Sequence, residues 1–265
     1  MKATGLILKN PVLLNKVLSD PDVWQEYVRR KYKGMADGLP VIRMNQIVDT
    51  DSHDVGPLTF LDGGSLPTDL ALLRLLCASY KDCRYFEIGT WRGESVANVA
   101  RVARECYTLN LSEKEMSEKG IQPKYISQIG YFSKGLENVV QLSGNSLDFD
   151  FEGLNRKFDV IFIDGGHHYE HVRNDTEKAF RHLMHHDSVL VWHDYAHHPE
   201  KVRYEVLAGI LDGTDKSIHG NIYHAAQTKC AVFLRKKIQG RKLDPPEEPE
   251  EYFEMKLIRK PISPK

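Results

Sequence analysis

Short apolar segments recur through the centre of the chain, and stretches with helical periodicity separate most of them. The apolar segments are residues 84–88, 106–109, 138–142, 158–163 and 188–192. Runs of four to eight residues of this kind, bounded by turn residues, are typical of strands that are buried on both faces. The alternation of strands and helices predicts an α/β fold in which helices cover both faces of a mostly parallel, twisted sheet.

The helix predicted after Tyr169 shows the periodicity most clearly, because its apolar positions share one face. That face consists of Val172, Thr176, Ala179, Phe180 and Leu183. A further helix is predicted near residues 202–211. Two strand-like runs follow, NIYHAA and KCAVFLR, with a short polar turn between them. They predict a C-terminal antiparallel hairpin at the end of the sheet.

The first 80 residues have a different pattern and are predicted to form an N-terminal helical and irregular extension. A helix is expected over residues 10–34, with Pro21 as an interruption, and another over residues 65–80. Residues 34–64 are rich in Gly, Pro and Asp, which predicts an irregular segment that serves as a lid or a dimer arm. The predicted domains are therefore 1–80, a central domain 81–240, and a linker and tail 241–265.

The charge balance argues against polyanionic partners. Lys plus Arg (36) nearly equals Asp plus Glu (37), so no large basic surface is predicted for nucleic acid or for a membrane. No apolar run approaches the length of a membrane span. The four cysteines form no CxxC pair. These features predict a cytoplasmic protein, with a homodimer as the assembly considered.

The sharpest local motif is the turn in RYFEIGTWRGES. An apolar strand ends near Glu87, the turn contains Gly89 and Gly93, and a helix is predicted to begin near Ser95. Glycine is needed where the backbone adopts positive φ or approaches a ligand closely. In an open parallel sheet, ligands bind beyond the carboxyl ends of the strands, so Glu87 is expected to meet a cationic group such as the ammonium of an amino acid.

The spacing E-x-G-x-x-x-G resembles the first motif of class I S-adenosylmethionine-dependent methyltransferases. It differs from the dinucleotide motif G-x-G-x-x-G, because Thr90, Trp91 and Arg92 supply no glycine two residues after Gly89. The resemblance implies a Rossmann-like methyltransferase fold for about residues 83–235. NAD is the second choice of cofactor.

Later segments extend the resemblance. The run DGGHHYEHVRND matches D-G-x-H-x-Y-E-x-V-x-x-D of a bacterial subgroup of small-molecule methyltransferases, and His193 and Asp194 match the pair that ends the next strand. QLSGNS resembles the segment that borders adenine. The cofactor-binding residues that the resemblance implies are Glu87, Gly89, Thr90, Trp91, Gly93, Ser95, Asn110, Leu111, Asn145, Ser146, Asp164 and Gly165.

One position departs from the family pattern. The second strand should end in an acid that binds both ribose hydroxyls, whereas this chain has Asn110. An amide loses a charge-assisted hydrogen bond, so the departure weakens the expected cofactor binding without abolishing it. Ser112 or Glu113 is the alternative ribose contact.

Histidines and aspartates at the strand ends are the candidates for chemistry on the acceptor. His167 is the first choice for a base or a substrate-orienting group, followed by Asp194 and His193, with Asp175 expected to orient a histidine. Asp164 and Asp194 together are candidate ligands for Mg²⁺, which prefers oxygen donors. Trp91 and Trp192 are expected to pack in the core or to wall a ligand.

The function predicted from these motifs is methyl transfer from S-adenosylmethionine to a small-molecule acceptor, with O-methylation preferred. The alternatives are a non-catalytic module that binds S-adenosylmethionine and regulates a partner, which Asn110 favours, and a metal-dependent hydrolase, which leaves the Glu87–Gly93 turn unexplained. The acceptor itself is left open by the motifs.

Overall fold

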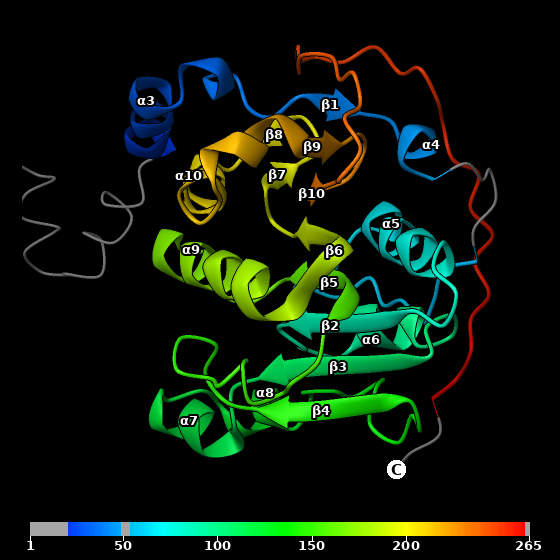
Figure 1. The fold of residues 1–265 in the computed structure, drawn as a ribbon. Coiled ribbons are helices and arrows are strands. Elements are labelled where there is room, and N and C mark those ends of the chain that lie inside the picture. The colour runs from blue at the N-terminus through cyan, green and yellow to red at the C-terminus, as the bar shows by residue number, and fades with distance from the viewer. Residues whose placement is uncertain (1–20, 49–53, 263–265) are drawn as a thin grey trace, which may run out of the picture.

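The computed structural model describes residues 21–48 and 54–262. Its centre is an eight-stranded sheet in the order β1-β9-β10-β6-β5-β2-β3-β4, which Figure 1 shows from β1 at the top to β4 at the bottom. The strands are β1 (Val41–Ile42), β2 (Arg84–Ile88), β3 (Glu105–Asn110), β4 (Val139–Ser143), β5 (Phe158–Ile163), β6 (Met184–Trp192), β9 (Ile222–Ala225) and β10 (Ala231–Phe233). A separate two-stranded sheet joins β7 (Ala196–His198) to β8 (Lys201–Val202).

The pairing confirms the predicted mostly parallel sheet. Strands β4, β3, β2, β5 and β6 are parallel to one another, whereas β10 is antiparallel to both β6 and β9. The antiparallel β9–β10 hairpin is the one predicted from NIYHAA and KCAVFLR. Because parallel strands end at the same edge of a sheet, the residues that follow β2 to β6 are brought to one edge.

Helices cover both faces of the sheet, as the sequence predicts. They are α3 (Pro21–Lys31), α4 (Met44–Ile47), α5 (Pro67–Ala78), α6 (Glu94–Val99), α7 (Glu113–Glu118), α8 (Pro123–Ile126), α9 (Tyr169–Lys178) and α10 (Tyr204–Asp212). One-turn segments of other helix types are η1 (Lys33–Met35), η2 (Ala179–Leu183, a π-helix that continues α9) and η3 (Lys216–Asn221). No helix among residues 21–48 and 54–262 is both long and apolar enough to cross a membrane.

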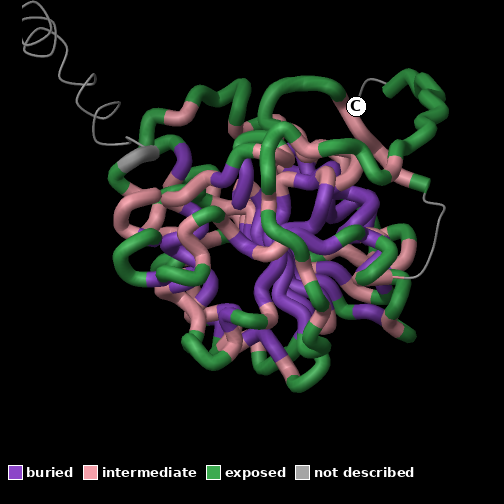
Figure 2. The backbone as a smooth tube through the Cα atoms, turned by 90° about the horizontal axis from the view of Figure 1, so that it is seen from above, coloured by how far each residue is buried: buried purple, intermediate pink, exposed green. Residues whose placement is uncertain are grey.

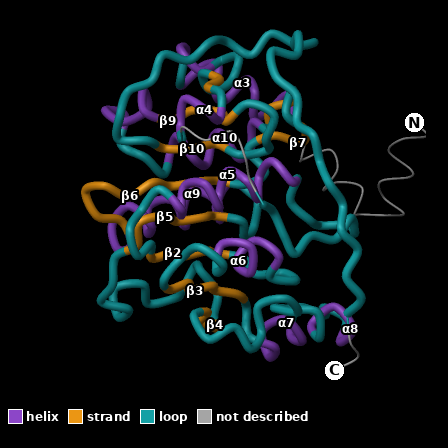
Figure 3. The backbone as a smooth tube through the Cα atoms, turned by 90° about the vertical axis from the view of Figure 1, so that its right-hand side faces the viewer, coloured by secondary structure: helices purple, strands orange, loops and turns teal. Residues whose placement is uncertain are grey.

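Alternate residues of each strand enter two separate hydrophobic cores. Phe86 and Ile161 pack in the core beneath α3, α9 and α10, whereas Tyr85 and Val160 pack in the core beneath α4, α5 and α6. Figure 3 shows α5 and α6 on the viewer's side of the sheet, and Figure 2 shows the buried backbone gathered at the centre. This two-fold alternation is the pattern expected of strands that are covered on both faces.

The described part of residues 1–80 is not a separate unit. Strand β1 pairs in parallel with β9 and so extends the main sheet, while α5 contributes Leu72 and Leu76 to the same core as Tyr85. The described part of the helix predicted over residues 10–34 is α3, Pro21–Lys31. The earlier part of that prediction lies outside the described residues.

The predicted irregular segment is irregular only in part, since residues 41–42 form β1 and residues 44–47 form α4. Residues 54–64 lie along the first turns of α6. The backbone N–H of Thr59 donates to Glu94, the guanidinium of Arg92 donates to the carbonyl oxygen of Asp62, and the N–H of Gly56 donates to Asn98. This stretch packs beside the turn that follows β2.

One carboxylate receives several hydrogen bonds from α3 and its surroundings. Asp212, at the end of α10, accepts hydrogen bonds from the hydroxyls of Tyr27, Tyr32 and Tyr169 and from the ammonium of Lys31. Burial raises the pKa of Asp212, but these hydrogen bonds outweigh the effect and lower the pKa to about 2. The N-terminal helix is thereby connected to α9 and α10.

Candidate functional site

The carboxyl ends of five neighbouring parallel strands gather the predicted site residues at one edge of the sheet. Gly89 follows β2, Asn110 ends β3, Asn145 follows β4, Asp164 follows β5 and His193 follows β6. The predicted cofactor residues that keep part of their surface open at this edge are Gly89, Trp91, Asn110, Leu111, Asn145, Ser146, Asp164 and Gly165. The structure therefore brings the predicted cofactor and acceptor residues together.

Glycine is required at both positions of the turn after β2. Gly89 has φ of +100°, and a Cβ built on it would lie 2.0 Å from the carbonyl oxygen of Asp164. Gly93 has φ of +75° at the N-terminus of α6, and its Cβ would lie 2.5 Å from Oγ of Ser133. No other residue fits these positions without a backbone shift.

Glu87 lies beneath the turn, and its predicted contact with a cationic ligand stays a prediction. Its side chain is fully buried, and its carboxylate accepts hydrogen bonds from the hydroxyls of Tyr85 (2.8 Å), Ser95 (2.8 Å) and Thr108 (2.9 Å). Burial raises the pKa of Glu87 to about 8 despite these donors. Glu87 and Ser95 therefore brace the turn from beneath, connecting β2, β3 and α6.

Asn110 closes the other side of the turn. Its Oδ1 lies 3.4 Å from the backbone nitrogen of Thr90, which donates to it, and its amide nitrogen donates to the carbonyl oxygen of Leu111 at 3.1 Å. The hydroxyl of Thr90 lies 2.6 Å from that of Thr108, in the buried layer. Ser112, an alternative ribose contact, instead caps α7 by a reciprocal bond with Glu115. Asn110 thus remains the half-buried polar group at the end of β3.

The two tryptophans have different environments. Trp192 is fully buried and donates from Nε1 to the hydroxyl of Thr176, so it belongs to the core. Trp91 is half-buried in the turn, with φ of +41°, and it stacks on Tyr125 with ring centroids 3.8 Å apart. A left-handed conformation in a bulky residue is uncommon and is concentrated at functional sites. Trp91 thus places an aromatic face beside the predicted cofactor edge.

The segment after β4 is held by α9. The backbone carbonyl of Ser146 accepts hydrogen bonds from Asn174 and Lys178, and Asn174 also donates to Asp175. Asp175 is buried, and its second oxygen would lie 3.6 Å from a Cβ on Gly165. Its hydrogen-bonding neighbours are thus Asn174 and Ser146 instead of the histidine that the sequence predicted. Asp175 supports the loops after β4 and β5.

His193 is a buried connector and not an accessible base. Its Nε2 lies 3.1 Å from Oδ2 of Asp69 on α5, and its Nδ1 lies 2.9 Å from Oδ1 of Asp164. Burial alone would lower the pKa of His193, but Asp164, Asp194 and Asp69 raise it well above its ordinary value. The imidazole is therefore protonated near neutral pH and links α5 to the end of β5, and its predicted catalytic role stays a prediction.

Asp194 is surrounded by cations. Its Oδ1 lies 3.3 Å from Nζ of Lys229 and 3.5 Å from Nδ1 of His193, and its Oδ2 lies 3.8 Å from a guanidinium nitrogen of Arg203. Burial raises the pKa of Asp194, but these partners outweigh it and hold the pKa below its usual range. Asp194 also has φ of +54°, a strained conformation for a non-glycine residue. A carboxylate with so low a pKa is a weak base and accepts a proton poorly. Asp194 is therefore suited to orienting its cationic neighbours and compensating their charge.

His167 is the accessible member of the group. Its side chain is 47% exposed, and its Nδ1 lies 3.8 Å from Oδ2 of Asp194. Burial and the nearby Arg203 lower its pKa, so the imidazole is neutral at pH 7 and able to accept a proton. The adjacent His168 instead lies 3.2 Å from Glu205, which also accepts the backbone N–H of Tyr169 at the start of α9.

The residues around Asp164 and Asp194 do not fit a divalent metal. Carboxylate oxygens of these two residues and a nitrogen of His193 lie within 4.8 Å of one another, a spacing that would suit a cation. However, the protonated His193 has no lone pair to offer, and Lys229 and Arg203 already compensate the charge of Asp194. The predicted Mg²⁺ ligands are paired with the protein's own cations.

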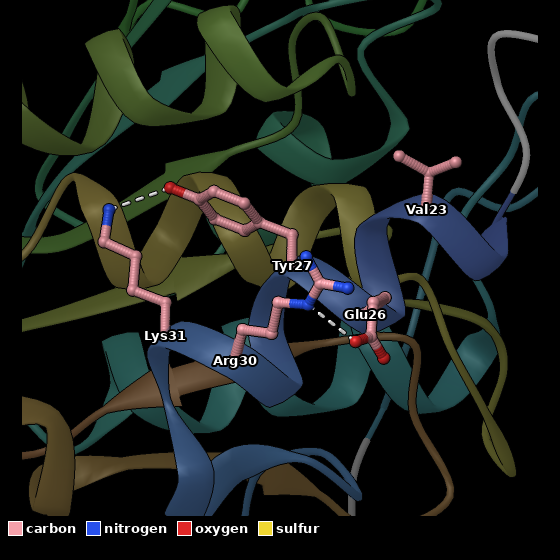
Figure 4. Close-up of a pocket in the computed structure, with 5 residues that line it drawn as sticks. All are labelled: Val23, Glu26, Tyr27, Arg30 and Lys31. Atoms are coloured by element: carbon pink, nitrogen blue, oxygen red, sulfur yellow. Dashed lines mark hydrogen bonds and ion pairs between the residues drawn. The ribbon is translucent and has the colours of Figure 1, made fainter.

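Two hollows lie in different parts of the described structure. The larger, about 690 Å³, lies along α3, where Figure 4 shows Arg30 paired with Glu26 and Lys31 with Tyr27. None of the predicted site residues lines it. The smaller, about 10 Å³, lies at the strand ends, with a volume suited to one water molecule. Its lining is Ile163, Asp164, Gly165, Gly166, His167, Val172, Trp192, His193 and Asp194.

Comparison with known families finds a match in the central part of the chain. Residues 86–195 match the family model described as a methyltransferase domain. This stretch is therefore similar to a methyltransferase domain. It extends from β2 to just beyond β6, and so contains the glycine turn, His167 and Asp194. A search of curated proteins gives no match.

Solved structures of methyltransferases also match the chain. An O-methyltransferase from Bacillus cereus in complex with SAH has 18% identity and a TM-score of 0.44, with 82% of this chain and 100% of that chain covered. TomG, an O-methyltransferase from Streptomyces achromogenes in complex with SAM, has 18% identity and a TM-score of 0.44, with coverage of 65% and 82%. CcbJ from Streptomyces caelestis has 18% identity and a TM-score of 0.33, with coverage of 47% and 50%. The chain spans about half the length of the first structures matched.

Three residues of the candidate site were not predicted from the sequence. Asp69 lies on an otherwise apolar helix, where its position in the first turn indicates only a capping role. Lys229 lies in the turn of the β9–β10 hairpin, and Arg203 precedes α10. The hairpin and the helix were predicted, but only their packing against β6 shows that these side chains reach Asp194.

Proposed function

We propose that this protein transfers the methyl group of S-adenosylmethionine to a hydroxyl group of a small-molecule acceptor. The observation that supports the proposal most strongly is the placement of a neutral, accessible imidazole at the same sheet edge as the glycine turn. His167 belongs to the loop after β5, and the carbonyl oxygen of Asp164 in that loop is packed against Gly89.

The cofactor would bind across the ends of β2, β3 and β4. The turn at residues 89–93 offers close approach to its backbone, Asn110 offers an amide to the ribose, and Asn145 and Ser146 flank the position expected for adenine. Trp91 provides an aromatic surface beside them. When bound, S-adenosylmethionine supplies an electrophilic methyl group on a positively charged sulfur.

His167 would take the proton of the acceptor hydroxyl as the new oxygen–carbon bond forms and the carbon–sulfur bond breaks. The electron pair of the broken bond stays on sulfur, so the products are a methyl ether, a neutral thioether and a protonated imidazole. Asp194 faces Nδ1 of His167 and would orient the ring and stabilise its positive charge. General base catalysis of this kind contributes roughly 10²–10⁴-fold to a rate.

The test is equilibrium binding followed by turnover. Isothermal titration calorimetry with S-adenosylmethionine and with NAD should give saturable binding of the first alone. Incubation with methyl-labelled S-adenosylmethionine and a panel of phenols, sugars and hydroxy acids should then release S-adenosylhomocysteine and a labelled ether. Binding without turnover on any acceptor would favour a regulatory module, and preferential binding of NAD would reject the proposal.

A further inference from the structure

The pair Asp164 and Asp194 would be an attractive place for a divalent cation if the carboxylates stood alone. They do not, because two side chains from remote parts of the sequence reach Asp194. Lys229 Nζ lies 3.3 Å from Oδ1, and a guanidinium nitrogen of Arg203 lies 3.8 Å from Oδ2. The side chains of Lys229 and Arg203 are only 16% and 21% exposed, so solvent screens these contacts weakly.

The position of Lys229 is fixed by its backbone. Its N–H donates to Oδ1 of Asp69 at 2.8 Å, and Asp69 in turn contacts His193 through its other oxygen. The same buried carboxylate therefore anchors both the lysine and the histidine that face Asp194. An ammonium held in this way is preorganised, and little conformational freedom has to be lost when a ligand binds.

The charge of Asp194 is compensated without a metal. The single carboxylate of Asp194 already has two cationic partners, the ammonium of Lys229 and the guanidinium of Arg203. A divalent ion added between Asp164 and Asp194 would stand next to the ammonium and the guanidinium, which would repel it. Removal of Lys229 or Arg203 would leave the negative charge of Asp194 less compensated. The affinity of the site for a divalent metal should then rise.

We propose that Lys229, assisted by Arg203, occupies the functional place of a divalent cation: it holds Asp194 in position and presents fixed positive charge to the oxygen of the acceptor. The effect of Lys229 on the acceptor oxygen rests on the proposed function, whereas the exclusion of a metal from the site does not. Lys229 is a positioning residue for Asp194 and His167, and methyl transfer is independent of added divalent ions.

The experiment measures metal binding directly. Electron paramagnetic resonance titration of the full-length protein with Mn²⁺ should detect no site at millimolar Mn²⁺ in the wild type. Lys229→Met should bind Mn²⁺ at least tenfold more tightly, and the double variant that also carries Asp194→Asn should lose this site. Lys229→Arg keeps a cation and should stay metal-free, while Lys201→Met, at an exposed lysine of β8, serves as the control for loss of one charge.

Turnover provides the second measurement. Lys229→Met should lower kcat at least tenfold with a smaller effect on KM for S-adenosylmethionine, and Lys229→Arg should restore most of the rate. The proposal is overturned if the wild type binds Mn²⁺ and Asp164→Asn removes that site, or if Lys229→Met binds Mn²⁺ no better than Lys201→Met. If no acceptor is ever methylated, the proposed function fails, but the Mn²⁺ titration still decides whether Lys229 excludes the metal.

Discussion

The carbonyl oxygen of Asp164 occupies the space in which a side chain on Gly89 would begin. A Cβ at Gly89 would lie 2.0 Å from this oxygen and 2.9 Å from the backbone nitrogen of Gly165. The contact is between two backbones, so no rotamer change relieves it. The turn that is proposed to bind the cofactor and the loop that carries His167 therefore have to move together.

Gly89→Ala should damage folding as well as cofactor binding, and Gly89→Val should be worse. The strain of positive φ alone costs about 1–2 kcal/mol in a non-glycine residue. Gly135→Ala is a matched control, since Gly135 has φ of +88° but nothing within 4 Å of its Cβ position. Urea unfolding should show a larger loss of free energy for Gly89→Ala than for Gly135→Ala. Equal losses would show that the contact with Asp164 relaxes freely.

His167→Ala should lower kcat by about 10²–10⁴-fold while changing the dissociation constant of S-adenosylmethionine little. Because the pKa of His167 is lowered by burial and by Arg203, the wild-type rate should be level near neutral pH and fall on the acid side, below pH 6.5. The residual rate of His167→Ala should not show this fall below pH 6.5. His168→Ala, at the neighbouring residue paired with Glu205, should retain most of the rate; equal losses at both positions would assign His167 a structural role.

Glu87→Gln should change how stability depends on pH. Burial raises the pKa of Glu87 to about 8, so the folded protein retains a proton that the unfolded chain releases near pH 4.5. Stability should therefore fall as pH rises from about 4.5 to about 8, by up to roughly 5 kcal/mol for this group. Glutamine cannot ionise, so urea unfolding of the ligand-free variant should show a smaller decline over this range. An unchanged slope would show that Glu87 is ionised in the fold.

Asp69→Asn should be strongly destabilising at pH 6, because it leaves the protonated His193 without its partner on α5. Breaking one side of a buried ion pair costs about 3–5 kcal/mol. The raised pKa of His193 means that its contribution is fully present below pH 6.5 and is lost as pH rises through the folded pKa. Asp187→Asn removes the partner of the exposed His186 at 2.8 Å and should cost less than 1 kcal/mol in the same denaturation assay. Similar costs would show that the buried pair is not ionised.

Periodicity was sufficient to predict the sheet because its central strands are continuous apolar runs. Phe158–Ile163 was predicted with the bounds that β5 has, and Arg84–Ile88 with those of β2. Strand β1 was missed since two residues, Val41 and Ile42, carry no periodicity. They become a strand only because β9 offers an open edge.

The polar contacts at the site were less predictable than the strands. Glu87 and His193 were placed at the correct strand ends, but the sequence does not indicate on which side of the sheet a side chain finds its partners. Tyr85 and Asp69 are the partners of Glu87 and His193, and both lie in segments whose sequence pattern is that of ordinary core. Such partners are defined by tertiary packing, which single-sequence patterns do not contain.

The reversed direction of β10 has an evolutionary consequence. Since Ala231 at the start of β10 pairs with Trp192 at the end of β6, the tip of the β9–β10 hairpin reaches the same rim as the parallel strands. The residues in the turn of a tight hairpin can be exchanged without disturbing the two strands that the turn connects. Selection could thus diversify the proposed acceptor side of the site, through the neighbours of Lys229, while the turn around Gly89 that is proposed to bind the cofactor stayed unchanged.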